Sequence, residues 1–453
     1  MNDSQADATF NRQDRPAPAT SPEQAIGSPA PKPIQFQPGH RARLVLGGAV
    51  VAGAFTLGLV AGGGLDGVTG EVVAESSLTG RAEFATLEET WELIHAQWPE
   101  PDQLDDAALI YGAARGMVDA VGDEGHSAFL DPAATAEFQR AREGEYVGIG
   151  VEVDSRCGVP VVASTMKGSP ARAAGLLPGD VIAEVEGVST RRLDIQGLRD
   201  LILGNEGDQL TLTIERPSEP APLEIDVVRQ TIDREPVTWR WLPEKTVHMR
   251  VTGFEPGVNG EVRAALETIR AAGAEQLILD LRGNPGGLVP EVIGVASQFL
   301  DEGSTIFQEQ ARDQEAKLIK TVGRTGQWLD LALVVLIDDE SASGAEVLAA
   351  ALRENGRAQL IGETTFGTGT VLSTFTQDDG SSVVLATAFW LTPDGDHVWQ
   401  EGVEPDQLVT LARDAFPSRP EDDPELTASE LESSPDAQLR TAFEALEGGD
   451  SSS

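Results

Sequence analysis

The pattern of apolar and polar positions divides the chain into segments with different periods. Residues 1–39 show no apolar period and are rich in Pro, Ala, Ser and Gln, which is typical of a disordered arm. Residues 44–63 then run without a single charged residue, a length that spans a bilayer core. The pattern therefore predicts a transmembrane anchor within 40–65, preceded by a disordered arm.

The charges on either side of this apolar run predict its orientation. His40, Arg41 and Arg43 precede it, whereas Asp66 and Glu71 follow it. The positive-inside rule then leaves the arm in the cytoplasm and the rest of the chain outside, anchored to the cytoplasmic membrane by a single pass. The alternative is export followed by cleavage of a signal peptide, although the apolar core of such a peptide is shorter, about 7–15 residues.

Residues 78–143 have the apolar spacing of helices. Phe84, Leu87 and Trp91 fall on one face of a first helix, and the small residues in 105–122 suit a second helix that packs closely. We expect a helical segment here.

The rest of the chain changes period twice more. Residues 144–232 alternate like strands, with turns at Gly and Pro, and predict a β-rich domain. Residues 233–412 alternate apolar strands with amphipathic helices, which predicts an α/β core with a mainly parallel sheet. Residues 413–453 are acidic and Ser-rich, with one weak helical pattern at 436–446, and we expect a solvated tail.

Composition narrows the classes of partner. The chain carries 74 acidic and 33 basic residues, a net charge of −41, which disfavours nucleic acid as a partner. The single cysteine, Cys157, excludes an intrachain disulfide. No pattern indicates a metal or an organic cofactor, so none is expected. The sequence leaves open whether the chain forms a homo-oligomer.

Two stretches of the predicted core have the chemistry of a catalytic site. Residues 279–287 are a buried strand that runs into a glycine turn, and Ser343 stands at the start of a helix, after another apolar strand. A helix N-terminus favours developing negative charge, and glycine lets backbone N–H groups approach a bound group closely. Ser343 is therefore a candidate nucleophile, and the amides of Gly344 and of Gly286 or Gly287 are candidate oxyanion donors.

The alternative for Ser343 is a structural role. A serine at the start of a helix commonly caps it by accepting a hydrogen bond from a backbone amide. Ser341 is equally placed to act as that cap, so position alone leaves both interpretations open.

The β-rich domain resembles a PDZ domain. The long stretch at 169–182, "SPARAAGLLPGDVI", matches the most recognisable part of that family. The resemblance implies a loop of successive backbone N–H groups that binds the terminal carboxylate of a peptide. The residues that match this loop are Tyr146, Val147, Gly148, Ile149 and Gly150.

The order of helical segment, PDZ domain and core resembles the carboxyl-terminal processing peptidases, the S41 family of serine endopeptidases. The resemblance covers roughly residues 84–446. It rests on the combination of "YGAARGMVDAVGD", "YVGIG", "SPARAAGL", "LDLRGNPGG", "ESASGAE", "NGRAQLIGETTFG" and "TPDG…GVEPD".

The resemblance implies that Ser343 is the nucleophile, with a lysine base 25 residues later and a glutamine four residues beyond it. This sequence departs from the family there, because the two positions hold Thr368 and Leu372. A threonine hydroxyl lacks the basicity of a buried neutral amine. Lys317 and Lys320 lie in a polar stretch and are poor substitutes.

His126 is the best candidate for a replacement base. "GDEGHSAF" resembles the Gly-His-Ser/Thr segment of tricorn-type peptidases, which use serine, histidine and a glutamate. By that resemblance Glu401 would orient the imidazole, and Ser127 would help to hold it or the oxyanion. The alternative is a structural histidine, the role we expect for His248 and His397.

The sequence therefore predicts a membrane-anchored serine endopeptidase that captures protein C-termini outside the cytoplasm. The alternative from another functional class is a catalytically inactive relative that acts as a PDZ-bearing scaffold for C-termini.

Overall fold

The computed structural model describes residues 43–46 and 84–449, apart from 124–125, 143–145, 157–158, 192, 194, 233–234, 413–414 and 424. The predicted arm lies outside these residues, as do 40–42 and 47–65 of the predicted anchor. Arg43–Leu46 form strand β1, which pairs antiparallel with β4 (Val151–Arg156). Among the described residues, no helix is both long enough and apolar enough to cross a membrane. The four described residues of the predicted anchor are therefore extended and not helical, and the anchor over the remaining residues stays a prediction.

The two helices predicted before the β-rich domain are present as α1 and α2. Asp105 caps α2 by accepting hydrogen bonds from the amides of Ala107 and Ala108. The pattern does not predict the short strand β2 (Ala128–Leu130), which pairs antiparallel with β19 (Ser382–Leu391) and so ties this segment to the core. The segment comprises α1 (Ala85–Gln97), η2 (Pro101–Gln103), α2 (Asp106–Asp119), β2 and α3 (Pro132–Arg142), with β2 at Ala128–Leu130.

The β-rich domain is an antiparallel sheet in the order β1-β4-β5-β6-β8-β9, with β7 beside β6 and a separate β3–β10 pair. Its core joins alternate strand residues such as Val151, Val153 and Val162 to Leu198 of α5. Its further elements are β3 (Tyr146–Gly148), β5 (Val159–Thr165), α4 (Pro170–Ala173), β6 (Val181–Val185), β7 (Val188–Ser189), α5 (Ile195–Ile202), β8 (Gln209–Glu215), β9 (Leu223–Val228) and β10 (Gln230–Ile232).

The predicted parallel sheet of the core is confirmed. Its strands lie in the order β11-β12-β13-β16-β17-β20, and every neighbouring pair is parallel except β11 and β12. The elements are β11 (Val237–Trp241), β12 (Thr246–Val251), α6 (Val258–Ala271), β13 (Gln276–Asp280), α7 (Val289–Phe299), β16 (Ala332–Ile337), α8 (Gly344–Glu354), β17 (Gln359–Gly362) and β20 (Gln407–Leu408).

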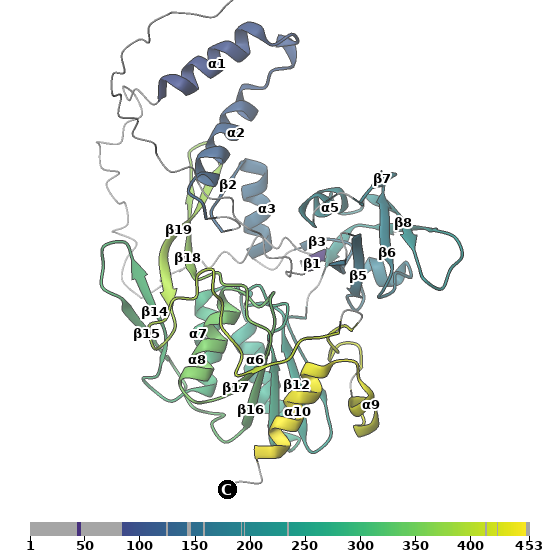
Figure 1. The fold of residues 1–453 in the computed structure, drawn as a ribbon, viewed down its shortest axis with the longest axis vertical. Coiled ribbons are helices and arrows are strands. Elements are labelled where there is room, and N and C mark those ends of the chain that lie inside the picture. Colours follow the sequence, from purple (N-terminus) through teal and green to yellow (C-terminus); the bar gives the residue numbers. More distant parts are fainter. Residues whose placement is uncertain are drawn as a thin grey trace, which may run out of the picture. The chain divides into compact units, whose positions relative to one another are not determined.

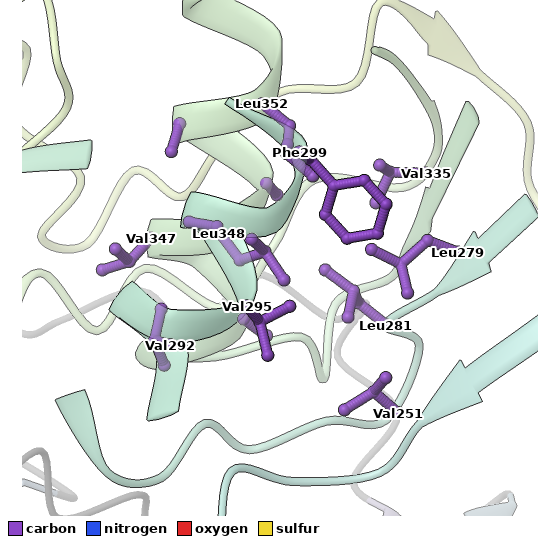
Figure 2. Close-up of a cluster of buried hydrophobic side chains, with 14 of the residues drawn as sticks. Val251, Leu279, Leu281, Val292, Val295, Phe299, Val335, Val347, Leu348 and Leu352 are labelled. Carbon is purple, nitrogen blue, oxygen red and sulfur yellow. The ribbon is translucent and has the colours of Figure 1, made fainter. Parts of the chain in front are cut away.

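Both faces of the parallel sheet are covered, which explains why its strands are almost continuously apolar. Leu279 and Val335 point to the face packed by α6, α7 and α8, where Figure 2 shows them against Phe299. Ile278 and Val334 point to the opposite face, which α10 covers (Figure 1). Successive side chains of a strand point to opposite faces of the sheet. Neighbouring residues such as Ile278 and Leu279 therefore face opposite sides.

A second, antiparallel sheet in the order β15-β14-β19-β18 accompanies the parallel one (Figure 1). The apolar pattern of the sequence does not predict this second sheet. Its strands are β14 (Thr305–Ala311), β15 (Lys317–Lys320), β18 (Thr370–Thr376) and β19 (Ser382–Leu391). The hairpin β18–β19 begins directly after the loop that contains Thr368, and so it positions one wall of the candidate site.

The expectation of a solvated tail is wrong for most of residues 413–453. The weak helix is real, as α10 (Ala437–Gly449), and a further helix, α9 (Ala428–Ser433), precedes it. Leu439, Phe443 and Leu446 recur at helical spacing and are buried against the parallel sheet. The high acidic content of the region masked this narrow apolar stripe.

Candidate active site

Three loops meet at the carboxyl edge of the parallel sheet, where such folds place ligand sites. They follow β13, β16 and β17. The amide of Ala342 donates to the carbonyl of Asn284 over 2.9 Å, which joins the first two loops. A Cβ atom added at Gly286 would lie 2.6 Å from the amide nitrogen of Gly344 and 2.7 Å from Cβ of Ser343. The predicted glycine turn and the predicted nucleophile are therefore in direct contact.

Ser343 occupies the N-cap position of α8 and its amide donates to Glu346 as in a capping box, but its Oγ makes no capping hydrogen bond and has the features of a positioned nucleophile. It stands immediately before α8 with φ of 52° and ψ of −114°, a strained conformation for a residue with a side chain. Its Oγ is buried and has no hydrogen-bond partner among the described residues. Ser341 does not cap the helix either, because its Oγ donates to the carbonyl of Leu281 over 2.9 Å.

The carboxylate of Glu346 holds the backbone around Ser343 in place. It accepts hydrogen bonds from the amide of Ser343 (2.8 Å), the hydroxyl of Thr365 (2.6 Å), and the amides of Gly367 (2.7 Å) and Thr368 (3.0 Å). Burial raises the pKa of Glu346, and these four donors act against that rise. Glu346 thus joins the start of α8 to the loop before β18.

The candidate oxyanion donors differ in their availability. The amide of Gly286 donates to Oδ1 of Asn284 over 2.8 Å, so it is already engaged. No hydrogen bond from the amide of Gly287 or Gly344 is found among the described residues. Among the described residues, the amides of Gly287 and Gly344 are therefore the two candidates left available to donate to an oxyanion.

The position of the family's lysine holds no base. Thr368 is buried, and its Oγ1 accepts a hydrogen bond from the amide of Ser343 over 3.2 Å, not from its hydroxyl. Leu372 is also buried and packs with Phe138 and Val384. Lys317 and Lys320 are exposed and lie on strand β15, not in the buried loops around Ser343.

His126 is buried beside an acidic partner. Its Nδ1 lies 3.0 Å from Oδ1 of Asp123, and the two side chains are only 5% and 7% exposed. Its Nε2 is buried without a hydrogen-bond partner among the described residues. The hydroxyl of Ser127 donates to Oδ2 of Asp123 over 2.7 Å.

Two contacts bring His126 to the Ser343 side of the molecule. Its ring meets the ring of Phe366 edge-on, with centroids 6.0 Å apart. The amide of Phe366 donates to the carbonyl of Ser341, two residues before Ser343. On the other side, Ala386 of β19 pairs with Leu372 and donates its amide to Oγ of Ser127 over 3.0 Å. His126 therefore packs against the loop that contains Phe366 and Thr368, the latter being the position of the family's lysine.

The predicted partner of His126 needs correction. Glu401 is exposed, and the one hydrogen-bonded ring nitrogen of His126 contacts Asp123 instead. The sequence signal for Asp123 is its spacing, because an aspartate three residues before a histidine in a turn is within reach of the ring. The resemblance to a glutamate-using family does not point to this local pair.

His248 and His397 make contacts of a structural kind. His248 is fully buried, its Nε2 lies 2.8 Å from Oδ2 of Asp280, and burial lowers its pKa. His397 is exposed and its ring meets that of Phe389. Within the described residues, no group of three or more His, Cys, Asp or Glu side chains could hold a metal ion.

The predicted carboxylate-binding loop has two unused donors. Tyr146–Gly148 form β3, and Val147 lies opposite Thr231 in its pairing with β10. The amides of Ile149 and Gly150 donate no hydrogen bond to any described residue, whereas their carbonyls accept from Ala171 and Met166.

Two models of known protein families match this chain. Residues 245–409 match the model of peptidase family S41, and residues 161–216 match that of the PDZ domain.

Individual relatives extend the likeness over most of the chain. The carboxy-terminal processing protease CtpA of Bacillus subtilis (strain 168) is 33% identical over 368 residues, which cover 81% of this chain and 76% of that protein. A probable CtpA-like serine protease of Staphylococcus aureus (strain N315) is 32% identical over 336 residues, 73% of this chain and 66% of that protein. The solved structure of the photosystem II D1 C-terminal processing protease superimposes with a TM-score of 0.51 at 26% identity, and the match covers 74% of this chain and 95% of that one.

Proposed function

Since the chain belongs to peptidase family S41 and is a serine-type protease with a PDZ domain, we propose that it is a membrane-anchored endopeptidase of the carboxy-terminal processing type. Its PDZ domain would bind the C-terminus of a substrate outside the cytoplasm and present the chain to Ser343.

In the proposed mechanism His126 takes the part of the missing lysine. Nε2 of His126 accepts the hydroxyl proton as Oγ of Ser343 attacks the peptide carbonyl. The amides of Gly344 and Gly287 stabilise the oxyanion. The imidazolium then gives the proton to the leaving amine as the C–N bond breaks, and water hydrolyses the acyl-enzyme by the same route.

One observation carries this proposal. Oγ of Ser343 and Nε2 of His126 are both buried polar atoms without a partner among the described residues. Buried polar atoms are nearly always hydrogen-bonded, so an unpaired one calls for a functional explanation. Two such atoms, on segments joined through Phe366 and Ser341, are the donor and acceptor that a serine–histidine pair requires.

The test is cleavage of an unfolded protein by the intact chain, together with labelling by a fluorophosphonate probe. We expect the wild type to cleave and to be labelled, and Ser343→Ala to do neither. Ser373→Ala is a matched control, because its half-buried hydroxyl only contacts that of Thr387. A wild-type chain that neither cleaves nor labels would refute the catalytic proposal.

A second candidate function is a non-catalytic scaffold for C-termini. Thr368 and the apolar packing of Leu372 favour it, because together they remove the lysine and glutamine of the family's site. The two functions share PDZ binding and differ only in cleavage, so the same experiment separates them.

We expect peptides with a free C-terminal carboxylate to bind more tightly than their amidated forms. The amides of Ile149 and Gly150 donate to no described residue, and the pairing of β4 with β1 indicates that this edge accepts an antiparallel strand, so a bound peptide would replace β1 there. Calorimetry on the Ser343→Ala chain measures both affinities. Gly150→Ala should remove the difference, since its Cβ would lie 2.3 Å from Cβ of Ser169. Equal affinities in the unmodified loop would contradict carboxylate binding.

The proposed topology rests on the charges around residues 44–63. Protease added to intact cells is expected to digest the chain after residue 65 and to spare an epitope placed in residues 1–39. Digestion of that epitope from outside, or a mature chain that begins after residue 65, would exclude the anchor.

A further inference from the structure

The turn that carries His126 holds its imidazole through one nitrogen. The backbone amide of His126 donates to the carbonyl of Asp123 over 3.2 Å, and Nδ1 lies 3.0 Å from the carboxylate of the same residue. The other nitrogen, Nε2, has no partner among the described residues. Asp123 therefore decides which nitrogen carries the proton of the neutral ring.

Ser127 fixes the direction of hydrogen bonding around Asp123. Its Oγ accepts the amide proton of Ala386 over 3.0 Å, and it donates its own proton to Oδ2 of Asp123 over 2.7 Å. Burial acts to raise the pKa of Asp123, but hydrogen bonds from His126 and Ser127 outweigh it and hold that pKa below its usual value. An ionised carboxylate can only accept hydrogen bonds, so Nδ1 must donate.

We propose, on the premise that His126 is the catalytic base, that Asp123 and Ser127 are positioning residues that keep Nε2 of His126 unprotonated and ready to accept the proton of Ser343. Neither touches the substrate. The amide that orients Ser127 belongs to Ala386, which pairs with Leu372 in the β18–β19 hairpin. The tautomer of the base is thus set from the same hairpin that follows Thr368.

Asp123→Asn should reverse the tautomer without removing any heavy-atom contact. The hydroxyl of Ser127 still needs an acceptor, so the Asn carbonyl must face it and the Asn NH₂ group must face Nδ1. The proton then moves to Nε2, which can no longer act as a base. We expect kcat to fall by about 10²-fold or more, within the range for loss of a general base, with a much smaller change in KM.

Ser127→Ala should have opposite effects in the two backgrounds. In the wild type Asp123 still accepts from Nδ1, so we expect a loss of less than about tenfold, comparable with one neutral hydrogen bond. In the Asp123→Asn chain the same change lets the amide flip and present its carbonyl to Nδ1. The double variant should therefore be more active than Asp123→Asn alone, by about tenfold, which corresponds to about 1.4 kcal/mol. A purely structural role predicts a further loss instead.

Nitrogen NMR of the full-length chain gives a readout independent of catalysis. The His126 signals are assigned by their absence in His126→Ala, and Nε2 should be unprotonated in the wild type, protonated in Asp123→Asn and unprotonated again in the double variant. An unchanged tautomer in folded Asp123→Asn overturns the inference, as does a double variant less active than Asp123→Asn. A tautomer that moves as expected while cleavage does not change supports the positioning role and refutes His126 as the base. Far-UV circular dichroism establishes that each variant is folded.

Discussion

His126→Ala is expected to lower kcat by about 10²–10⁴-fold, the usual contribution of a general base. Without the imidazole, no described side chain is hydrogen-bonded to the hydroxyl of Ser343 to accept its proton. The hydroxyl of Thr368 contacts the backbone amide of Ser343 and not its Oγ. Residues that act as one unit are not additive, so the double variant with Ser343→Ala should be no slower than Ser343→Ala alone. Steady-state cleavage of an unfolded protein by the three variants provides the measurement.

The other histidines supply the control for this prediction. His397 is exposed; its backbone bridges to Leu391 and its ring contacts that of Phe389, so His397→Ala, which keeps the backbone bridge, should leave kcat within about twofold, as is usual for surface substitutions. Substrate binding by the PDZ domain should be intact in every variant. If His126→Ala retained full activity while Ser343→Ala lost it, the base would have to be sought elsewhere.

Asp436→Ala is expected to lower the free energy of unfolding by about 3–5 kcal/mol, because it leaves part of a buried charge uncompensated. Nη1 of Arg282 donates to both carboxylate oxygens of Asp436 at 3.0 Å, and both side chains are almost fully buried. Asp436 also accepts from the amides of Ser418 (2.8 Å) and Leu439 (3.0 Å), so it caps α10 as well. Denaturant unfolding followed by circular dichroism measures the loss.

An exposed ion pair is the matched control. Asp330 pairs with Arg270 but is 73% exposed, so Asp330→Ala should change the free energy of unfolding by less than about 1 kcal/mol. An Asp436→Ala chain that loses no more than this control would show that the buried pair contributes little.

The buried cluster of His248, Asp280, Arg282 and Asp436 predicts how the free energy of unfolding depends on pH. Burial acts to raise the pKa of Asp280, but Arg282 and His248 outweigh it and hold this pKa far below its usual value. A lowered native pKa means that the contribution of Asp280 is fully present above the pKa of the unfolded state. It is lost as the pH falls toward the native pKa. Unfolding free energies should therefore decrease on acidification below the ordinary aspartate range, and less so in Asp280→Asn.

The elements that could be predicted from the sequence are those whose period reflects burial on one or two faces. The strands of the parallel sheet are continuously apolar because helices cover both faces, so both the sheet and the helices between its strands were predictable. The hairpin β18–β19 was not, since its residues 373–377 are mostly polar and half-exposed. Helix α10 was not predicted to be packed because only four buried apolar side chains carry its packing within an acidic stretch.

The candidate site divides in a similar way. Ser343 and the glycine turn were predictable because they follow strands of one parallel sheet, whose carboxyl ends meet at one edge. The partner of His126 was not, because the geometry of a short turn decides which carboxylate reaches the ring. Leu372 was recognisable as a departure from the family, but only its packing against Phe138 shows that the position has become part of the core. Installing a lysine and glutamine at 368 and 372 would therefore also disrupt packing.

The pairing of Arg282 with Asp436 has a consequence for biosynthesis. Arg282 belongs to the loop that leads to Gly286 and Gly287, whereas its partner lies more than 150 residues later in the chain. During translation, the buried guanidinium of Arg282 gains its second carboxylate only after Asp436, directly before α10, has been synthesised. A nascent chain released or arrested before residue 436 would hold Ser343 and His126 but lack the contact that fixes Arg282, whose loop leads to the glycine turn beside Ser343. Proteolytic competence would thus require synthesis to continue past residue 436, which limits self-cleavage by chains arrested earlier.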